Sequence, residues 1–425
     1  MHVSRFLAAA ALLAVPLQAQ PAQVTAIRAD RLIVGDGTQI ASPVVLIQGE
    51  RITAVGPAAS VTVPRDARLI DLRGHTLLPG FIDAHTHLAS IDNDGGDLSA
   101  LKETPAHGAI YATVTAKKTV EAGFTTVREA GSLGYVDVAV RDAINRGLIP
   151  GPRIRASGPA LGTTGGHADV NGWSPFLNLP GTGAIVDGAD AVRRQVRLNV
   201  KYGADQIKIV ATGGILSVGD AIGAPQMTDE ELHAAVSEAV RLGRKVMAHA
   251  HAGEGLLGAV RAGVASIEHG SLVSDEAIAE MKQRGTYLVP TLIILEEIVR
   301  DGASKGVPPY AVEKAKAIAA ERRVRLRGPG RCRREPAGGY HAAATSDVRD
   351  EGRGDGARER GGEIDGVGGV GAAAGTSATG AVTIAPNHVK APSAHERSDV
   401  CLSGVGMSEV RRDFRRSNDR GYVSD

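Results

Sequence analysis

The sequence GADQIKIV occupies residues 203–210 and is typical of a short apolar β-strand that follows a glycine. An amphipathic stretch at 229–242 and Gly243 come next, and the run KVMAH at 245–249 is typical of a second strand. Two strands joined through a helix are parallel, because the crossover returns the chain to the same end of the sheet. The segment therefore predicts a strand–helix–strand unit of an α/β fold.

The same unit recurs on both sides of this segment, from residue 76 to residue 322. Strand-like runs occur at 76–83, 124–129, 153–157, 206–210, 245–249, 264–268 and 286–290. Glycines such as Gly123 and Gly263 precede the next strand, where a left-handed residue ends a helix. Seven such units favour a (β/α)8 TIM barrel that lacks a recognisable eighth strand, and an open doubly wound sheet is the alternative. The barrel is favoured because polar residues follow several strands, where barrels build their sites.

The first strand delivers two of these polar residues, His85 and His87. A strand has a period of two, so both imidazoles point to the same side and can share one metal ion. A lone His-x-His pair is weak evidence, because core and loop histidines produce the same pattern.

Later strands add further candidates. Lys208 lies inside an apolar strand, where an ammonium group is costly unless it is paired or neutralised. His249 ends the next strand, with His251 just beyond it, and Glu268-His269-Gly270 ends the one after. Histidines and a lysine at successive strand ends are hard to explain as packing, so we expect a shared site.

These motifs resemble the amidohydrolase superfamily, in particular its imidazolonepropionase-like and Xaa-Pro dipeptidase-like branch. The resemblance rests on FIDAHTH at 81–87, QIKI at 206–209, AHAH at 248–251 and IEHG at 267–270. It spans about residues 26–320 and implies a TIM barrel with a small N-terminal β-sandwich domain.

The resemblance also implies a binuclear metal centre, usually zinc. By position, His85 and His87 would bind one divalent ion, and Lys208 would be carboxylated and bridge both ions. His249 and His269 would bind the second ion. Charge supports this assignment, since a carbamate converts a buried ammonium into an anionic ligand between two cations.

The reaction implied is the hydrolysis of an amide or peptide C–N bond, in which two metals activate water and polarise the carbonyl. Dipeptides of the Xaa-Pro type are the leading small-molecule substrates. A cyclic-amide hydrolase or a deaminase of the same superfamily is the alternative, although Lys208 favours two metals over one. A non-catalytic product of a shifted reading frame is a third hypothesis, and a homo-oligomer is left open.

Two more histidines are candidate substrate contacts. His167 lies in TTGGHAD at 163–169, a long loop that resembles a substrate-facing loop of this branch, with an ordinary loop histidine as the alternative. His251 has suitable chemistry but a loop position. Arg128 and Glu129 end the second strand and are interpreted as a structural ion pair.

Residues 21–75 alternate short apolar runs with turn residues, which predicts a small β domain or half-sandwich. The segment is too short to bury much surface by itself and needs another segment to complete it.

The first twenty residues have the layout of a secretory signal peptide: His2 and Arg5, an apolar run at 6–15 and the small residue Ala19. The apolar run is half of the ~20 residues that a spanning helix needs, so stable membrane insertion is the weaker interpretation. We expect a periplasmic or secreted protein. The lack of cysteine before Cys332 fits export without disulfides, and it fits the cytoplasm equally well.

Composition excludes some functions. The chain has 48 Lys and Arg against 47 Asp and Glu, so nothing in its charge indicates a nucleic-acid partner. Aromatic residues make up 3%, which also argues against platforms for stacking bases.

The pattern stops within residues 322–327, and residues 323–425 do not continue the family. They contain no eighth strand, no Gly-Thr-Asp run and no closing β segment for the N-terminal domain. The superfamily's general acid is an Asp at the end of the eighth strand, so no catalytic acid is identified; Asp347 and Asp365 lack strand context. The tail is interpreted as disordered or, by preference, as the product of a reading-frame shift, which leaves the activity of this chain in question.

Overall fold

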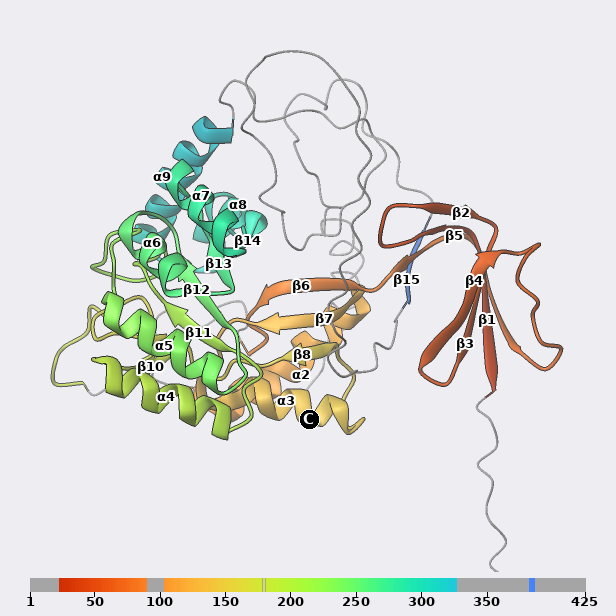
Figure 1. The fold of residues 1–425 in the computed structure, drawn as a ribbon, viewed down its shortest axis with the longest axis horizontal. Coiled ribbons are helices and arrows are strands. Elements are labelled where there is room, and N and C mark those ends of the chain that lie inside the picture. The colour runs from red at the N-terminus through yellow and green to blue at the C-terminus, as the bar shows by residue number, and fades with distance from the viewer. Residues whose placement is uncertain (1–22, 90–102, 178, 180, 327–381, 387–425) are drawn as a thin grey trace, which may run out of the picture. The chain divides into compact units, whose positions relative to one another are not determined.

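The computed structural model describes residues 23–89, 103–177, 179, 181–326 and 382–386 (Figure 1). The chain divides into two compact units, Met1–Pro79 with Gly366–Asn387, and Gly80–Asp365 with His388–Asp425. The predicted signal peptide at 1–20 lies outside the described residues.

The first unit is built on one mixed sheet. Its strand order is β15-β5-β1-β3-β4, with β2 paired to β1. The strands are β1 (Val24–Ile33), β2 (Gln39–Ala41), β3 (Pro43–Gln48), β4 (Arg51–Pro57), β5 (Arg68–Pro79) and β15 (Val382–Pro386). β1 and β5 are parallel, and the other pairs are antiparallel. Ile27, Val45 and Leu77 share an apolar cluster on this sheet.

Two sequence predictions are wrong here. The run 76–83 is not one barrel strand, because Thr76–Pro79 complete β5, where Leu77 is fully buried, and the barrel strand begins at Phe81. Pro79 and Gly80 separate the two strands. The tail also contributes a closing strand after all, since β15 pairs antiparallel with β5 with Val382 opposite Pro79. The N-terminal sheet thus extends past the predicted boundary at 75.

The second unit contains the seven predicted barrel strands, all paired in parallel. They are β6 (Phe81–Thr86), β7 (Phe124–Glu129), β8 (Arg153–Arg155), β11 (Ile207–Val210), β12 (Val246–Ala250), β13 (Ser266–His269) and β14 (Tyr287–Val289). A short strand, β9 (Leu161–Gly162), pairs with β11, and a second one, β10 (Ala184–Ile185), pairs with β9.

The strand order distinguishes a barrel from a doubly wound sheet. Neighbours follow chain order, as β6-β7-β8 and β11-β12-β13-β14, and the order does not reverse as it does in a doubly wound sheet. The backbone N–H groups of Asp205 and Gln206 both donate to Ala156 O and so link the end of β8 to the start of β11. The unit has the (β/α)8-barrel fold, with seven barrel strands among the residues that the structure describes.

Helices alternate with these strands. They are α2 (Pro105–Glu121), α3 (Val136–Asn145), α4 (Ala189–Lys201), α5 (Asp229–Arg241), α6 (Gly253–Ala262), α7 (Asp275–Arg284), α8 (Leu292–Asp301) and α9 (Pro309–Leu326). Thr228 and Glu231 form a reciprocal capping box that fixes the start of α5. Gly263 and Gly285 end α6 and α7 in the left-handed conformation, as the sequence predicts. α9 runs four residues past the predicted barrel end at 322.

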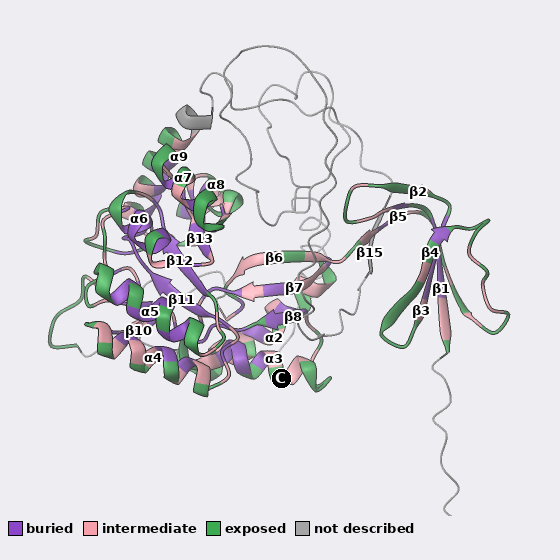
Figure 2. Cartoon of the chain, viewed as in Figure 1, coloured by how far each residue is buried: buried purple, intermediate pink, exposed green. Residues whose placement is uncertain are grey.

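The core lies between the strands and these helices (Figure 2). Ile207 and Ile209 of β11 are fully buried there with Leu232 of α5 and Leu256 of α6. Because strand side chains alternate, Lys208 points to the opposite side of β11, toward the barrel interior.

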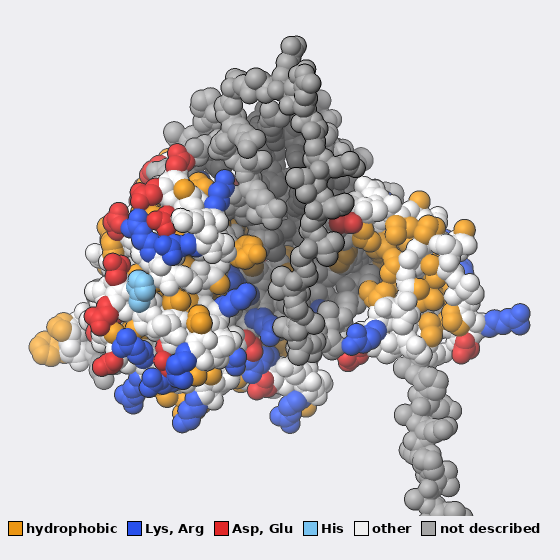
Figure 3. All heavy atoms as spheres, in the orientation of Figure 1, with side chains coloured by type: hydrophobic (Ala, Val, Ile, Leu, Met, Phe, Trp, Pro, Cys, Tyr) orange, Lys and Arg blue, Asp and Glu red, His pale blue; other side chains and the backbone are white. Residues whose placement is uncertain are grey.

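Acidic and basic side chains are both present over the barrel unit in the view of Figure 3. None of the helices that the structure describes combines the length and the apolar character that crossing a bilayer would require.

Candidate metal centre

Six histidines from different strand ends and loops gather in one cluster. The ring centre of His249 lies 4.6 Å from that of His269, 4.8 Å from that of His251 and 4.3 Å from that of His167. The ring centre of His85 lies 4.8 Å from that of His269 and 5.3 Å from that of His87. His85, His87, His249 and His269 therefore lie together, and the two proposed substrate histidines lie in the same group. Their roles as metal ligands and substrate contacts stay predictions.

Burial keeps most of this cluster neutral. His249 and His251 are 5% and 3% exposed, and loss of solvent lowers the pKa of His251 to about 3. Loss of solvent, with smaller contributions from neighbouring charges, also lowers the pKa values of His85, His249 and His269 well below 6.5. A metal ion binds the neutral imidazole, so the cluster is already in the form that a metal requires.

Lys208 lies within this group, 3% exposed, where its charge helps to lower the pKa values of His85 and His269. Burial lowers the pKa of Lys208 from 10.5 to about 8, against the opposing charge of Glu268. An amine reacts with carbon dioxide only in its neutral form, and a pKa of about 8 makes that form accessible near neutral pH.

Hydrogen bonds fix the ring orientation of the first pair. His85 Nδ1 lies 2.7 Å from Glu268 Oε2, and His87 Nδ1 lies 3.1 Å from the carbonyl oxygen of Gly131. A carboxylate and a carbonyl only accept, so each Nδ1 carries the proton and each Nε2 keeps its lone pair. His87 is the exposed member of the pair.

The other rings contact hydroxyl groups. His269 Nδ1 lies 2.7 Å from Thr291 Oγ1, and His251 Nδ1 lies 3.0 Å from Ser271 Oγ. Among the described residues, His249 Nε2 is the single buried side-chain nitrogen or oxygen without a hydrogen-bond partner. An orphaned buried nitrogen is costly in a folded protein and calls for a partner that a metal ion or substrate can supply.

Donor chemistry therefore fits a metal: neutral imidazoles, free Nε2 lone pairs and one orphaned nitrogen. Within the described part of the chain, no three His, Cys, Asp or Glu side chains are already arranged to hold an ion. Lys208 is not one of these residue types, and its carboxylation would add oxygen ligands beside histidines whose pKa values its charge already affects.

Comparison with known proteins agrees with this geometry. The model of the Amidohydrolase family matches residues 76–336. The chain belongs to this family. The predicted resemblance is confirmed, and the match continues beyond residue 322, where the sequence pattern was expected to end.

Proteins similar to this amidohydrolase include Xaa-Pro dipeptidases of the expected branch and an ochratoxinase. Ochratoxinase of Aspergillus niger is 33% identical over 293 residues, which cover 65% of this chain and 60% of that protein. The chain thus spans about three fifths of the length of this curated relative. A crystal structure of a Xaa-Pro dipeptidase with bound methionine in its active site is 37% identical, with a TM-score of 0.65, and covers 72% of this chain and 76% of that one.

A third relative is a prolidase whose crystal structure contains N-methylphosphonate-L-proline. It is 35% identical, with a TM-score of 0.66, and the likeness covers 72% of this chain and 75% of that one.

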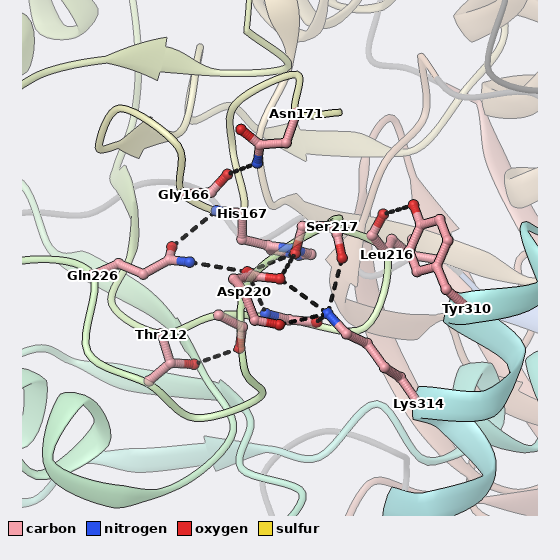
Figure 4. A network of polar contacts seen from close by, with 12 residues as sticks. Gly166, His167, Asn171, Thr212, Leu216, Ser217, Asp220, Gln226, Tyr310 and Lys314 are labelled. Carbon is pink, nitrogen blue, oxygen red and sulfur yellow. Dashed lines mark hydrogen bonds and ion pairs between the residues drawn. The ribbon is translucent and has the colours of Figure 1, made fainter. Parts of the chain in front are cut away.

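The amidohydrolase site also contains a network around His167 that the sequence did not predict (Figure 4). His167 Nδ1 lies 2.7 Å from Ser217 Oγ, and Ser217 Oγ donates to the Asp220 carboxylate at 2.7 Å. Because the single hydroxyl proton goes to Asp220, Ser217 accepts from His167, and His167 Nε2 keeps its lone pair. Gln226 supports both ends, accepting from His167 N and donating to Asp220 Oδ2.

Helix α9 anchors this network. Lys314 Nζ donates to the carbonyl oxygens of Gly214, Ser217 and Asp220 and to Asp220 Oδ1, at 2.8–3.1 Å. Burial opposes ionisation of Asp220, but hydrogen bonds from Ser217 and Lys314 outweigh it and hold its pKa below the usual value. The loop that positions His167 is thus fastened to the last described helix of the barrel.

The predicted Arg128–Glu129 ion pair is wrong. Arg128 Nη2 lies 2.6 Å from Glu268 Oε1, whereas Glu129 accepts from Leu88 N at 3.0 Å and from Thr86 Oγ1 at 2.9 Å. Neighbouring residues of a strand point to opposite faces, so Arg128 and Glu129 find different partners. Burial raises the pKa of Glu129 to about 8.

The remaining site prediction concerns the catalytic acid. The part of the chain described between β14 and Leu326 contains helices α8 and α9 and no eighth strand. Asp347 and Asp365 lie outside the described residues.

Proposed function

We propose that this amidohydrolase is a metal-dependent hydrolase of amide or peptide C–N bonds, with dipeptides of the Xaa-Pro type as its leading substrates. The observation that carries the proposal is the gathering of neutral histidines around buried Lys208 at the ends of parallel strands.

The ligand assignment follows from the cluster. His85 and His87 would hold one divalent ion, and His249 and His269 would hold the second, with carboxylated Lys208 bridging the two. Zinc is the ion that nitrogen-rich sites of this kind favour. Bound divalent ions would supply an activated water and a polarised carbonyl.

The chain's own residues orient and shield the reactants. Glu268 and Gly131 hold the rings of His85 and His87, and Thr291 holds His269. His167 and His251 lie beside His249 and are proposed to contact the substrate, His167 as an acceptor at Nε2. Burial of His249 and His251 keeps bulk water from this side of the site.

Support for a dipeptide comes from the relatives, because a Xaa-Pro dipeptidase and a prolidase are 35–37% identical to this chain. Ochratoxinase is a similar protein with a different named substrate, so a larger amide is the second candidate. Cyclic-amide hydrolysis and deamination remain as alternatives within the family.

One experiment separates these possibilities. The full-length protein is produced with zinc and bicarbonate, its metal content is measured, and release of proline is compared with hydrolysis of an aryl amide and a cyclic amide. We expect about two zinc ions per chain and slow release of proline, faster than hydrolysis of the aryl amide or the cyclic amide. Lys208→Met should lower the metal content, with Lys245→Met, outside the cluster, as the matched control. Zinc below one equivalent per chain would contradict the proposal.

Two further proposals concern the ends of the sequence. We propose export to the periplasm or the exterior through residues 1–20, to be tested by N-terminal sequencing of the mature protein. We also propose a change of reading frame near residues 322–327, which would remove the general acid and leave a metal-binding protein with little activity.

A further inference from the structure

Glu268 is fully buried one residue before the proposed ligand His269, yet its carboxylate contacts a different proposed ligand. Its Oε2 atom lies 2.7 Å from Nδ1 of His85, which is 183 residues away in the sequence. The IEHG motif thus supplies His269 for one proposed ion and the partner of His85 for the other.

The other carboxylate oxygen of Glu268 is occupied by fixed donors. Arg128 Nη2 and Ser266 Oγ both donate to Oε1, each at 2.6 Å. Arg128 is itself fixed, because its Nε donates to Ala84 O at 2.7 Å and its Nη1 donates to Ser266 Oγ at 2.9 Å. Because Arg128 and Ser266 both donate, the atom of residue 268 that faces them must be a hydrogen-bond acceptor.

We propose that Glu268 is a positioning residue that locks His85 in the tautomer with its proton on Nδ1, so that Nε2 presents a lone pair to a divalent cation. The inference rests on the proposed metal centre and deepens it. An acceptor behind a metal-binding imidazole both orients the ring and raises its basicity.

The network makes a sharp prediction for Glu268→Gln. An amide has one oxygen and one NH2 group, and the fixed donors Arg128 and Ser266 require the oxygen to face them. The NH2 group must then point at His85 Nδ1, which has to become an acceptor. The proton of His85 moves to Nε2, and the lone pair for the cation is lost although the side-chain volume is unchanged.

Ser266→Ala is the matched control. It removes one donor to Oε1, but Arg128 still faces that oxygen and the Glu268 carboxylate still accepts from His85. We expect Glu268→Gln to weaken zinc binding by about 10–100-fold and Ser266→Ala to change it much less.

The measurement has two parts on the full chain. Zinc affinity is determined by competition with a chromophoric chelator, and the tautomer of His85 is read from ¹⁵N chemical shifts of the metal-free protein, with His85→Gln used to assign the signal. Circular dichroism and thermal unfolding show whether each variant is folded.

The outcomes separate this inference from the proposed function. Suppose that the wild-type chain binds no zinc, but His85 carries its proton on Nδ1 in the wild type and on Nε2 in Glu268→Gln. That result overturns the proposed metal centre and keeps the positioning role of Glu268. Unchanged zinc affinity in Glu268→Gln, or an unchanged His85 tautomer, overturns the inference. If Glu268→Gln does not fold, the wild-type tautomer decides: a proton on Nε2 of His85 is incompatible with the proposal.

Discussion

His269 and Thr291 are hydrogen-bonded through Nδ1 and Oγ1 at 2.7 Å, and both have a left-handed backbone, with φ of 72° and 41°. These residues end the strand β13 and follow the next strand, β14. Positive φ is unfavourable for side chains with a Cβ atom, most of all for a β-branched one such as threonine. Backbone strain of this kind gathers at functional sites, where the surrounding structure holds it in place.

Thr291→Val replaces the hydroxyl group with a methyl group and leaves His269 Nδ1 without its partner. We expect a loss of about 1 kcal/mol in unfolding free energy, because a half-buried ring nitrogen loses its hydrogen-bond partner. We also expect weaker zinc binding. Chemical denaturation and chelator competition measure the two effects.

Thr291→Ser is the control for this change, since it keeps the hydroxyl group and removes the β-branch that is disfavoured at this φ. It should bind zinc as the wild type does. Equal zinc affinities for the valine and serine variants would show that the hydroxyl group does not position His269.

The hydrogen bonds from Lys314 of α9 to the loop at residues 214–220 give a second prediction. Lys314→Met keeps the length of the side chain but removes its bonds to the loop residues Gly214, Ser217 and Asp220. We expect a loss of about 2 kcal/mol in stability, since hydrogen bonds to a charged group are involved. Hydrogen exchange at residues 213–226 should accelerate, and KM should rise more than kcat falls as His167 loses its fixed orientation.

Tyr310→Phe tests whether loss of any hydrogen bond from α9 to this loop accelerates hydrogen exchange as Lys314→Met does. Tyr310 Oη donates to Leu216 O in the same loop at 2.9 Å, so this bond ends on the loop backbone and not on the Asp220 carboxylate. Exchange at Asp220 and Ser217 should stay slow in this variant. Equal acceleration of hydrogen exchange in both variants would mean that Lys314 has no special part in ordering Ser217 and Asp220, which hold His167.

The sequence was sufficient to predict the barrel strands and the histidine cluster, because both depend on local patterns. Apolar runs with a period of two indicate strands, and parallel strands carry their final residues to one end of the barrel. His85, His249 and His269 could thus be brought together without knowing any contact between them.

Long-range partners were beyond such reasoning. Glu268 lies 183 residues from His85, and Lys314 lies 94 residues from Asp220, so no spacing rule connects either pair. Arg128 was paired with its neighbour Glu129, although adjacent strand residues face opposite sides. Strand β15 was missed because its five residues lie in a glycine-rich region without a repeating pattern.

The pH dependence of stability gives a third prediction. Hydrogen bonds from Arg241 and Arg197 lower the pKa of Glu238 from 4.5 to about 2. A lowered pKa means that the unfolded chain takes up a proton first as the pH falls. The ion pairs therefore stabilise the fold above pH 4.5, and this stabilisation is lost between about pH 4.5 and pH 2.

Glu238→Gln should accordingly cost about 1 kcal/mol at pH 7, where the two exposed arginines still form their pairs in the wild type. The difference between wild type and variant should shrink as the pH falls below 4.5. Urea unfolding at pH 7, pH 5 and pH 3.5 measures it. A difference in unfolding free energy that grows toward low pH would contradict a stabilising role for the ionised Glu238 carboxylate.

The reading-frame proposal gives the last prediction. The family match reaches residue 336 and α9 continues to Leu326. Similarity to the family therefore extends past residue 322, where the strand–helix pattern of the sequence ends. Resequencing the gene across the codons for residues 322–327 should reveal an inserted or deleted base. The restored frame should encode an eighth strand that ends in Asp, because the departing nitrogen needs a proton donor.

The restored protein should unfold at a higher temperature and release proline faster than this chain. Replacing that Asp with Asn should remove the gain in rate but keep the gain in stability. Independent isolates that carry the frame found here would overturn the proposal.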